Sequence, residues 1–141
     1  MYKLEIVTPQ GVVFSDDVDM TTVNTADGEI GILENHMLLL TNLKPGKITI
    51  EKEGQEPVEY AATFGTVDVA GNKVIILAEE VYKISEIDVE KEIKIYQEAK
   101  EKLENKEGLS LQEILKFEEL KERAEALLKL AGVNPEAYVS P

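Results

Sequence analysis

The chain has 141 residues, of which 43% are hydrophobic and 30% are charged. This balance is typical of a folded protein with one or two small domains, and it excludes a disordered chain. Acidic residues outnumber basic ones by 28 to 15, which gives a net charge of -13. Since phosphate binding needs a basic face, this charge excludes nucleic acid as a partner.

Cysteine is absent from the sequence. Disulfide bonds, thiolate metal sites and a cysteine nucleophile are therefore excluded, and the composition fits a cytosolic compartment. The first ten residues, MYKLEIVTPQ, lack the charged and apolar blocks of a signal peptide. The apolar runs are far shorter than the roughly 20 residues that span a bilayer, so we expect any association with a membrane to be indirect.

Residues 1–84 contain short apolar runs that are separated by turn signals rich in glycine and proline. Such runs with regular turn punctuation are typical of a β-sandwich or barrel. No segment of helical length and periodicity interrupts them, which argues against a parallel sheet with crossover helices. We predict an N-terminal antiparallel β-sandwich domain, with strands over residues 2–7, 18–24, 47–51, 58–64, 66–69 and 74–78.

The stretch 27–46, DGEIGILENHMLLLTNLKPG, has the composition of a chain that turns tightly twice and presents a binding surface between the turns. It contains His36, the only histidine. A metal site would need further ligands and a catalytic histidine would need a nucleophile, so a histidine that holds the loop or faces a partner is favoured. Residues 37–40 are too apolar for an exposed strand. Core burial explains about half of them, and the others are candidates for a patch that a partner covers.

Residues 85–141 change to a helical pattern. In the first segment apolar residues recur every three or four positions, at Val89, Ile93, Tyr96, Ala99 and Leu103. This spacing predicts a helix over residues 88–104, with Ser85 or Asp88 as its N-cap.

A second helix is predicted over residues 111–131. Ser110 and Glu113 form the sequence pattern of a capping box at its start, and Gly132 and Pro135 are expected to end it. The short linker between the segments predicts an antiparallel helical hairpin that forms a second domain over residues 85–141. Two helices bury only one seam, so we expect the hairpin to lean on another surface and to be mobile.

Several spaced motifs, in this order, resemble the epsilon subunit of bacterial F-type ATP synthase. They are LEIVTPQGVVF at residues 4–14, followed by DGEIGIL, the lone histidine with LLLTNLKPG after it, FGTVDVAGNKVIILAEE and IDVEKE. The resemblance covers nearly the whole chain. The family usually has a proline-glycine pair before the histidine, where this sequence has Glu34 and Asn35; asparagine also adopts the left-handed backbone of such a turn.

The resemblance implies a non-catalytic rotor subunit without a metal or a cofactor. Its sandwich would pack on the gamma subunit and rest on the membrane-embedded c-ring, at the cytoplasmic face of the bacterial inner membrane. Its hairpin would fold down on the sandwich or extend into the catalytic hexamer of alpha and beta subunits, where it restrains ATP hydrolysis. Rotation driven by protons or sodium ions would thereby be coupled to ATP synthesis.

The resemblance also assigns contact residues. The c-ring contact would fall on Asp27, Gly28 and Glu29, with Glu29 as the main candidate. The gamma interface would include His36, Met37 and Leu38.

A nucleotide-sensing motif of the family reads Ile or Leu, Asp, two variable residues, then Arg and Ala. Ile87 and Asp88 match its start, whereas Lys91 and Glu92 replace the arginine and alanine. Arg123 matches a basic position of the second helix. The candidate residues for a regulatory ATP site are therefore Ile87, Asp88, Lys91 and Arg123, with a lysine that lacks the bidentate fork of arginine.

Two other classes of function stay open at the level of the residues alone. A stand-alone ligand-binding β-sandwich would use the hairpin to oligomerise, and it would have no affinity for gamma. An enzyme would need a nucleophile paired with a base, and the sequence shows no such pairing.

Overall fold

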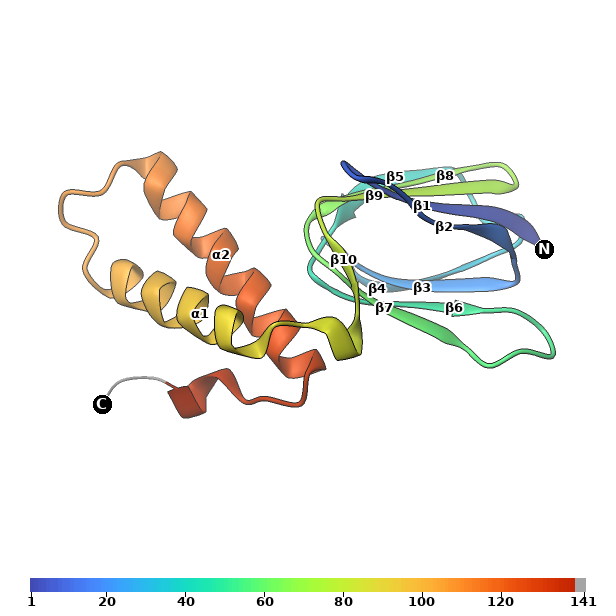
Figure 1. Cartoon of the computed structure of the whole chain (residues 1–141). Coiled ribbons are helices and arrows are strands. Elements are labelled where there is room, and N and C mark those ends of the chain that lie inside the picture. The colour runs from blue at the N-terminus through green and yellow to red at the C-terminus, as the bar shows by residue number, and fades with distance from the viewer. Residues whose placement is uncertain (139–141) are drawn as a thin grey trace. The chain divides into compact units, whose positions relative to one another are not determined.

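The computed structural model describes residues 1–138. They divide between Ile84 and Ser85 into two compact units. We call the first the β unit and the second the hairpin unit, and each is described by itself (Figure 1). In the part of the chain that the structure describes, neither long helix is apolar enough over a sufficient length to cross a membrane.

The β unit consists of ten strands. In chain order they are β1 (Tyr2–Thr8), β2 (Gly11–Val18), β3 (Met20–Thr25), β4 (Gly28–Leu33), β5 (Leu39–Leu43), β6 (Gly46–Glu51), β7 (Val58–Ala62), β8 (Gly65–Ala70), β9 (Lys73–Ala78) and β10 (Val81–Lys83).

These strands form one hydrogen-bonded sheet that folds over itself into two layers (Figure 1). The strand order is β10-β7-β6-β3-β5-β8-β9-β1-β2, and β4 pairs with β3 off this path. One layer contains β3, β4, β6, β7 and β10, and the other contains β1, β2, β5, β8 and β9. A single register pair, Thr25 with Leu43, joins β3 to β5 between the layers. The predicted β-sandwich is confirmed.

One strand pair departs from the predicted antiparallel arrangement. β1 and β9 run parallel, with Leu4 beside Val74 and Ile6 beside Ile76. A parallel pair needs a long connection, and here the connection consists of the seven strands between them. The local strand pattern contains no information about this pairing, because the two strands are far apart in the sequence.

The core lies between the two layers and consists of alternate residues from most of the strands. Leu4, Ile6, Val23, Ile32 and Ile76 are completely buried. The Tyr2 hydroxyl donates to the Ile32 carbonyl at 2.8 Å and shares a hydrogen bond of 2.7 Å with the Thr21 hydroxyl. This buried polar group is therefore satisfied, as a low-dielectric core requires.

Six strands were predicted and four were missed. The predicted strands correspond to β1, β3, β6, β7, β8 and β9, with bounds that shift by up to two residues. The missed strands are β2, β4, β5 and β10. β2 and β10 are the two ends of the strand order, and β2 is largely exposed, so neither shows the alternation of a half-buried strand. β4 and β5 lie in the stretch that was interpreted as a binding loop; they form because β3 and β8 offer backbone partners.

The hairpin unit contains α1 (Val89–Glu104) and α2 (Leu111–Leu130), flanked by the short 3-10 turns η1 (Ile84–Glu86) and η2 (Pro135–Tyr138). Asp88 is the N-cap of α1, and its side chain accepts from the Lys91 amide at 3.2 Å. The capping box of α2 is present, with Glu113 N–H donating to Ser110 Oγ and Ser110 N–H donating to Glu113 Oε1, both at 3.1 Å. Both predicted helices and both caps are confirmed.

The seam between α1 and α2 is thin. Its buried residues are Tyr96, Ala124 and Leu128. Four half-buried aliphatic residues pack against them: Val89, Ile93, Ile95 and Val133. Only one tyrosine and one leucine of this seam are therefore large and completely buried.

Gly65 provides a test of the packing between β8 and β9. A Cβ atom at this position would lie 1.7 Å from the Leu77 carbonyl oxygen, which belongs to the backbone and cannot rotate away. We expect Gly65→Ala to lower the free energy of unfolding of the β unit by about 3 kcal/mol or more, as measured by guanidinium unfolding and circular dichroism.

The matched control is Gly71→Ala, where the added Cβ meets nothing within 4 Å and only the positive φ of 68° opposes the substitution. That change should cost about 1–2 kcal/mol. Equal unfolding midpoints for the two variants would contradict the packing described for Gly65.

Candidate functional site

The turn between β3 and β4 presents Asp27, Gly28 and Glu29 to solvent. Gly28 has a φ of 101°, a conformation that favours glycine. The Thr25 hydroxyl donates to the Gly28 carbonyl at 2.7 Å and accepts from the Asp27 amide at 3.1 Å. The result is a braced, exposed acidic turn that contributes nothing to the core.

The loop between β4 and β5 is held by its own backbone and by His36. Asn35 has a φ of 62°, which confirms the left-handed residue expected before the histidine. The His36 amide donates to the Leu33 carbonyl at 3.2 Å, and its Nδ1–H donates to the Met37 carbonyl at 2.9 Å. His36 is half-buried, and the hydrogen bond orients its ring within the loop.

Four apolar side chains around this loop are exposed, and we call them the β4–β5 patch. They are Leu33, Met37, Leu38 and Leu40, with exposed fractions of 57%, 82%, 77% and 75%. Only Leu39 of the apolar run packs against the core. The sequence analysis included Met37, Leu38 and Leu40 among the candidates for a covered patch but did not single out Leu33. Without β4, the alternation that turns Leu33 outward cannot be recognised.

A cluster of exposed apolar residues favours a partner. Each such side chain contributes about 1.5–3 kcal/mol when it is transferred completely from water to an apolar contact. In contrast, residues 1–138 hold no group of three His, Cys, Asp or Glu side chains that would suit a metal ion. The exposed apolar side chains make this loop a candidate contact for a macromolecule.

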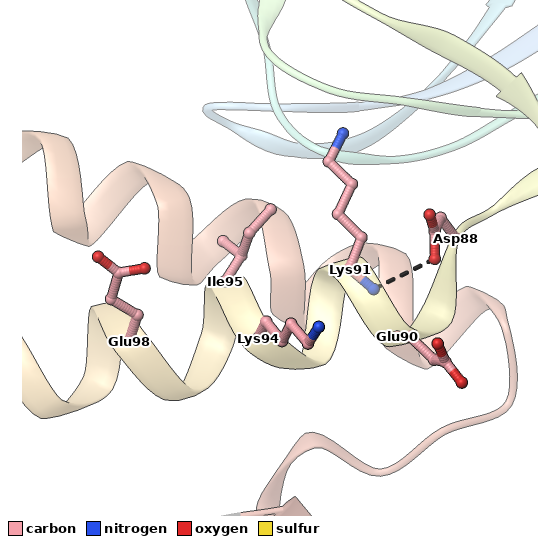
Figure 2. A pocket seen from close by; sticks show the side chains of 6 residues that line it. All are labelled: Asp88, Glu90, Lys91, Lys94, Ile95 and Glu98. Carbon is pink, nitrogen blue, oxygen red and sulfur yellow. Dashed lines mark hydrogen bonds between the residues drawn. The ribbon is translucent and has the colours of Figure 1, made fainter.

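The nucleotide candidates fall in two places. Asp88 and Lys91 line an open depression on α1, together with Glu90, Lys94, Ile95 and Glu98 (Figure 2). It contains three carboxylates and two ammonium groups, and the two ammonium groups point in different directions. Phosphate binding needs converging positive donors, and this depression has an excess of negative charge.

The other two candidates do not line this depression. Ile87 is 9% exposed and belongs to the buried apolar residues. Arg123 lies on α2 and forms an ion pair with Glu92, with Nε 3.3 Å from Oε1 and a terminal nitrogen 3.4 Å from Oε2. Glu92, which stands where the family motif has alanine, is buried and pairs with Arg123.

A second polar contact ties the C-terminal turn η2 to α1. The Tyr96 hydroxyl donates to Glu136 Oε1 at 3.2 Å, and Lys100 Nζ lies 3.7 Å from Glu136 Oε2. Burial raises the pKa of Tyr96 to about 12, and the hydrogen bond to the Glu136 carboxylate adds to this effect. No sequence pattern singled out Glu136, because its partners lie 36 to 40 residues earlier in the chain.

Comparison with known proteins places the chain in a family. Residues 1–84 match the family model of the β-sandwich domain of the ATP synthase delta/epsilon chain. An ATP synthase epsilon chain from Persephonella marina is 63% identical over 133 residues, which cover 94% of this chain and 98% of that protein. The chain belongs to the ATP synthase epsilon-chain family. The resemblance found in the sequence is thereby confirmed.

Other members of the family match mainly a shorter part. The ATP synthase epsilon chain of Aquifex aeolicus is 47% identical over 87 residues, or 62% of this chain and 64% of that protein. That length is close to the 84 residues of the β unit. The match to the Persephonella marina protein is longer and extends well into the hairpin unit.

Solved structures agree with the family. A chain in the Euglena gracilis mitochondrial ATP synthase structure, which contains the F1 head and c-ring, has a TM-score of 0.73 and 26% identity, with 89% of this chain and 78% of that chain covered. A chain in the Tetrahymena thermophila central stalk and c-ring structure has a TM-score of 0.64 at 16% identity, with 92% and 95% covered. The second match shows the fold alone.

The Tyr96 contact predicts how the hairpin responds to alkali. Because the folded pKa lies above the unfolded value of 10.0, the folded hairpin keeps its proton to higher pH. The stability from this group is fully present below pH 10 and is lost as the pH rises through about 12. We expect the α-helical circular dichroism signal to become less resistant to urea over this range.

The control is Tyr96→Phe, which removes the hydroxyl and keeps the ring. Its stability should fall less steeply over the same pH range than that of the unmodified chain. The same pH dependence in both proteins would show that the Tyr96 proton makes no contribution.

Proposed function

We propose that the chain is a non-catalytic central-stalk subunit of an F-type ATP synthase, which couples ion-driven rotation to ATP synthesis. The observation that carries the proposal is the 63% identity with an ATP synthase epsilon chain across 98% of that protein. The match includes more residues than the β unit contains, so it supports a role for both units. The chemistry itself would belong to the hexamer of alpha and beta subunits.

The proposed gamma interface is the β4–β5 patch with His36 beside it. Leu33, Met37, Leu38 and Leu40 are exposed apolar side chains in and beside one loop, and a stable subunit contact would cover side chains of this kind. The hydrogen bond from His36 Nδ1 to the Met37 carbonyl orders the loop before binding. A loop that is already ordered loses less conformational entropy when a partner binds.

The proposed c-ring contact is the acidic turn at Asp27, Gly28 and Glu29. The turn is exposed and braced by Thr25. Its carboxylates would accept hydrogen bonds from polar loops of the c-ring. This contact would place the chain peripherally, at the cytoplasmic face of the bacterial inner membrane.

The hairpin unit is proposed to restrain ATP hydrolysis when it extends toward the catalytic hexamer. The thin seam between α1 and α2 and the exposed side chains of Leu111 and Leu115 support a unit that can change partners. A regulatory ATP contact would rest on Asp88 and Lys91, because Arg123 pairs with Glu92. The restraint is therefore proposed to need no nucleotide.

Reassembly tests the whole proposal. A catalytic head complex that lacks its epsilon subunit is mixed with the full chain or with a truncation after Ile84, and ATP hydrolysis is measured. The full chain should bind and lower the rate by about twofold or more, and the truncated chain should bind without this effect. If the full chain neither bound nor changed the rate, the proposed function would be wrong.

The gamma interface is tested by placing a carboxylate in the patch. Met37→Asp and Leu38→Asp should each raise the Kd for a gamma-containing complex about tenfold or more, since each loses the burial of an apolar side chain. Val12→Asp is the control, because Val12 is 63% exposed but lies on β2. Equal losses for all three variants would contradict the assigned surface.

The c-ring contact is tested by charge reversal in the turn. Glu29→Lys should weaken binding to an isolated c-ring complex about fivefold, as expected for one exposed charged contact. Glu56→Lys changes the net charge equally at another exposed position. If this control weakened binding as much, the effect would be one of overall charge and the turn would not be the contact.

A further inference from the structure

The packing of the hairpin unit is uneven along its length. The buried residues of α2 are Ala124, Leu127 and Leu128, all in its second half. At its start, Leu111 and Leu115 are 72% and 51% exposed. On α1 the buried residues are Glu92, Tyr96 and Ala99. The helices are therefore held together mainly where α2 ends and packed loosely where the linker joins them.

One stripe of α1 makes polar contacts with both segments that follow it. Glu92, Tyr96 and Lys100 are spaced four residues apart, so they lie on the same helix face. Glu92 pairs with Arg123 of α2. Tyr96 and Lys100 share Glu136 of η2, which folds back against α1.

The Glu92–Arg123 pair is a contact that the closed hairpin must keep. The side chains of Glu92 and Arg123 are only 3% and 14% exposed. A buried carboxylate that loses its cation is strongly destabilised by desolvation. An intact pair adds little net stability, but it defines the register of α1 against α2. Separation of α2 from α1 breaks this pair, and a partly slipped hairpin would break it too, so the pair favours the closed register.

The Glu136 contacts add a second condition for opening. Glu136 follows α2 in the chain, and its carboxylate is held by two groups of α1. α2 can leave α1 along its whole length only after this contact has also broken. Lys100 also lies over the Tyr96 ring, 6.0 Å from its centroid, which places the two side chains together on the stripe.

We propose that Glu92, Tyr96 and Lys100 form a polar clasp that holds the hairpin closed through Arg123 and Glu136. The occupants of the clasp belong to this chain, so closure is an intrinsic property of the hairpin. The clasp itself does not depend on the proposed function, but its consequence does. When the clasp contacts break, α2 becomes available to restrain hydrolysis, so the clasp would set the fraction of subunits in that state.

Opening is measured on the full isolated chain by hydrogen exchange and by spin-label distances. The absence of cysteine permits two labels to be attached specifically, at Lys94→Cys on α1 and Lys129→Cys on α2, both exposed positions. Amides of residues 123–130 should exchange more slowly than those of residues 115–122 in the unmodified chain.

Three clasp variants are compared with a matched control. Glu92→Gln and Glu136→Gln remove one charge at nearly constant size, and Tyr96→Phe removes one hydroxyl. Each should raise exchange over residues 123–130 at least threefold and broaden the distance distribution. The control Glu107→Gln removes the same charge from the exposed linker and should change neither. If all clasp variants exchanged within the range of the control, the clasp would be wrong.

A fourth variant separates the loss of the ion pair from misfolding of the hairpin. Glu92→Leu combined with Arg123→Leu replaces the pair by apolar groups and should exchange more slowly than Glu92→Gln alone. If the double variant exchanged faster than the single one, the two side chains would not be coupled and the clasp would be overturned. Circular dichroism of each variant reports its helical content.

The same variants separate the clasp from the proposed function. In the reassembled complex, clasp variants should lower ATP hydrolysis relative to the unmodified chain, since more hairpins open. Faster exchange together with an unchanged hydrolysis rate would support the clasp and overturn the proposed restraint.

Discussion

The β unit and its exposed surface depend on the alternation of side chains between the core and the solvent. In β4, Ile32 is completely buried while the adjacent Leu33 is 57% exposed. In β5, Leu39 packs against the core while Leu40 is 75% exposed. Because successive residues of a strand point to opposite faces, a one-residue shift that buried Leu33 would expose Ile32. Leu33 and Leu40 are thus exposed because their neighbours Ile32 and Leu39 fill the core. A partner that covers the β4–β5 patch would not disturb the packing of the core.

The hairpin unit is stabilised differently from the β unit. Only Tyr96, Ala124 and Leu128 of its apolar seam are completely buried, and the other aliphatic side chains there are half-buried, so hydrophobic burial alone specifies its register weakly. Polar contacts supply the missing specificity, through Glu92 with Arg123 and through Glu136 with Tyr96 and Lys100. Such contacts have a low net energy when intact and are readily replaced by water. These properties suit an element that must be ordered when closed and able to open.

Under the proposed function, the two units would have different tasks in a rotary complex. A sandwich whose two layers share one core transmits force without changing shape, since close-packed interiors deform little. A hairpin with a thin seam responds to a change of partner at modest cost. The charge pattern of α1 is unfavourable for an anionic ligand, because the depression at Asp88 and Lys91 contains more carboxylates than ammonium groups. Under the proposed function, regulation would depend on contacts within the hairpin and not on an external ligand.

Local patterns predicted the elements that carry their own signal. The spacing of apolar residues located both helices, and the Ser110 and Glu113 pattern located the start of α2 to the residue. The missed strands β2, β4, β5 and β10 lack such a signal, because backbone pairing with a neighbouring strand creates them. For the candidate site, the sequence predicts the acidic turn, His36, Met37 and Leu38 as contact residues and includes Leu40 in a possible patch, but it does not single out Leu33.

By itself, the sequence determined the order of sandwich and hairpin, the helix caps and the family, since each depends on residues that are close together or on motifs in a fixed order. Only the tertiary structure decided that Leu33 and Leu40 face solvent, that β1 and β9 run parallel, and that Glu92 meets Arg123. The physical reason is that these features join groups far apart in the chain. Arg123 lies 31 residues beyond Glu92, and Glu136 lies 40 beyond Tyr96, so no local periodicity can encode either contact.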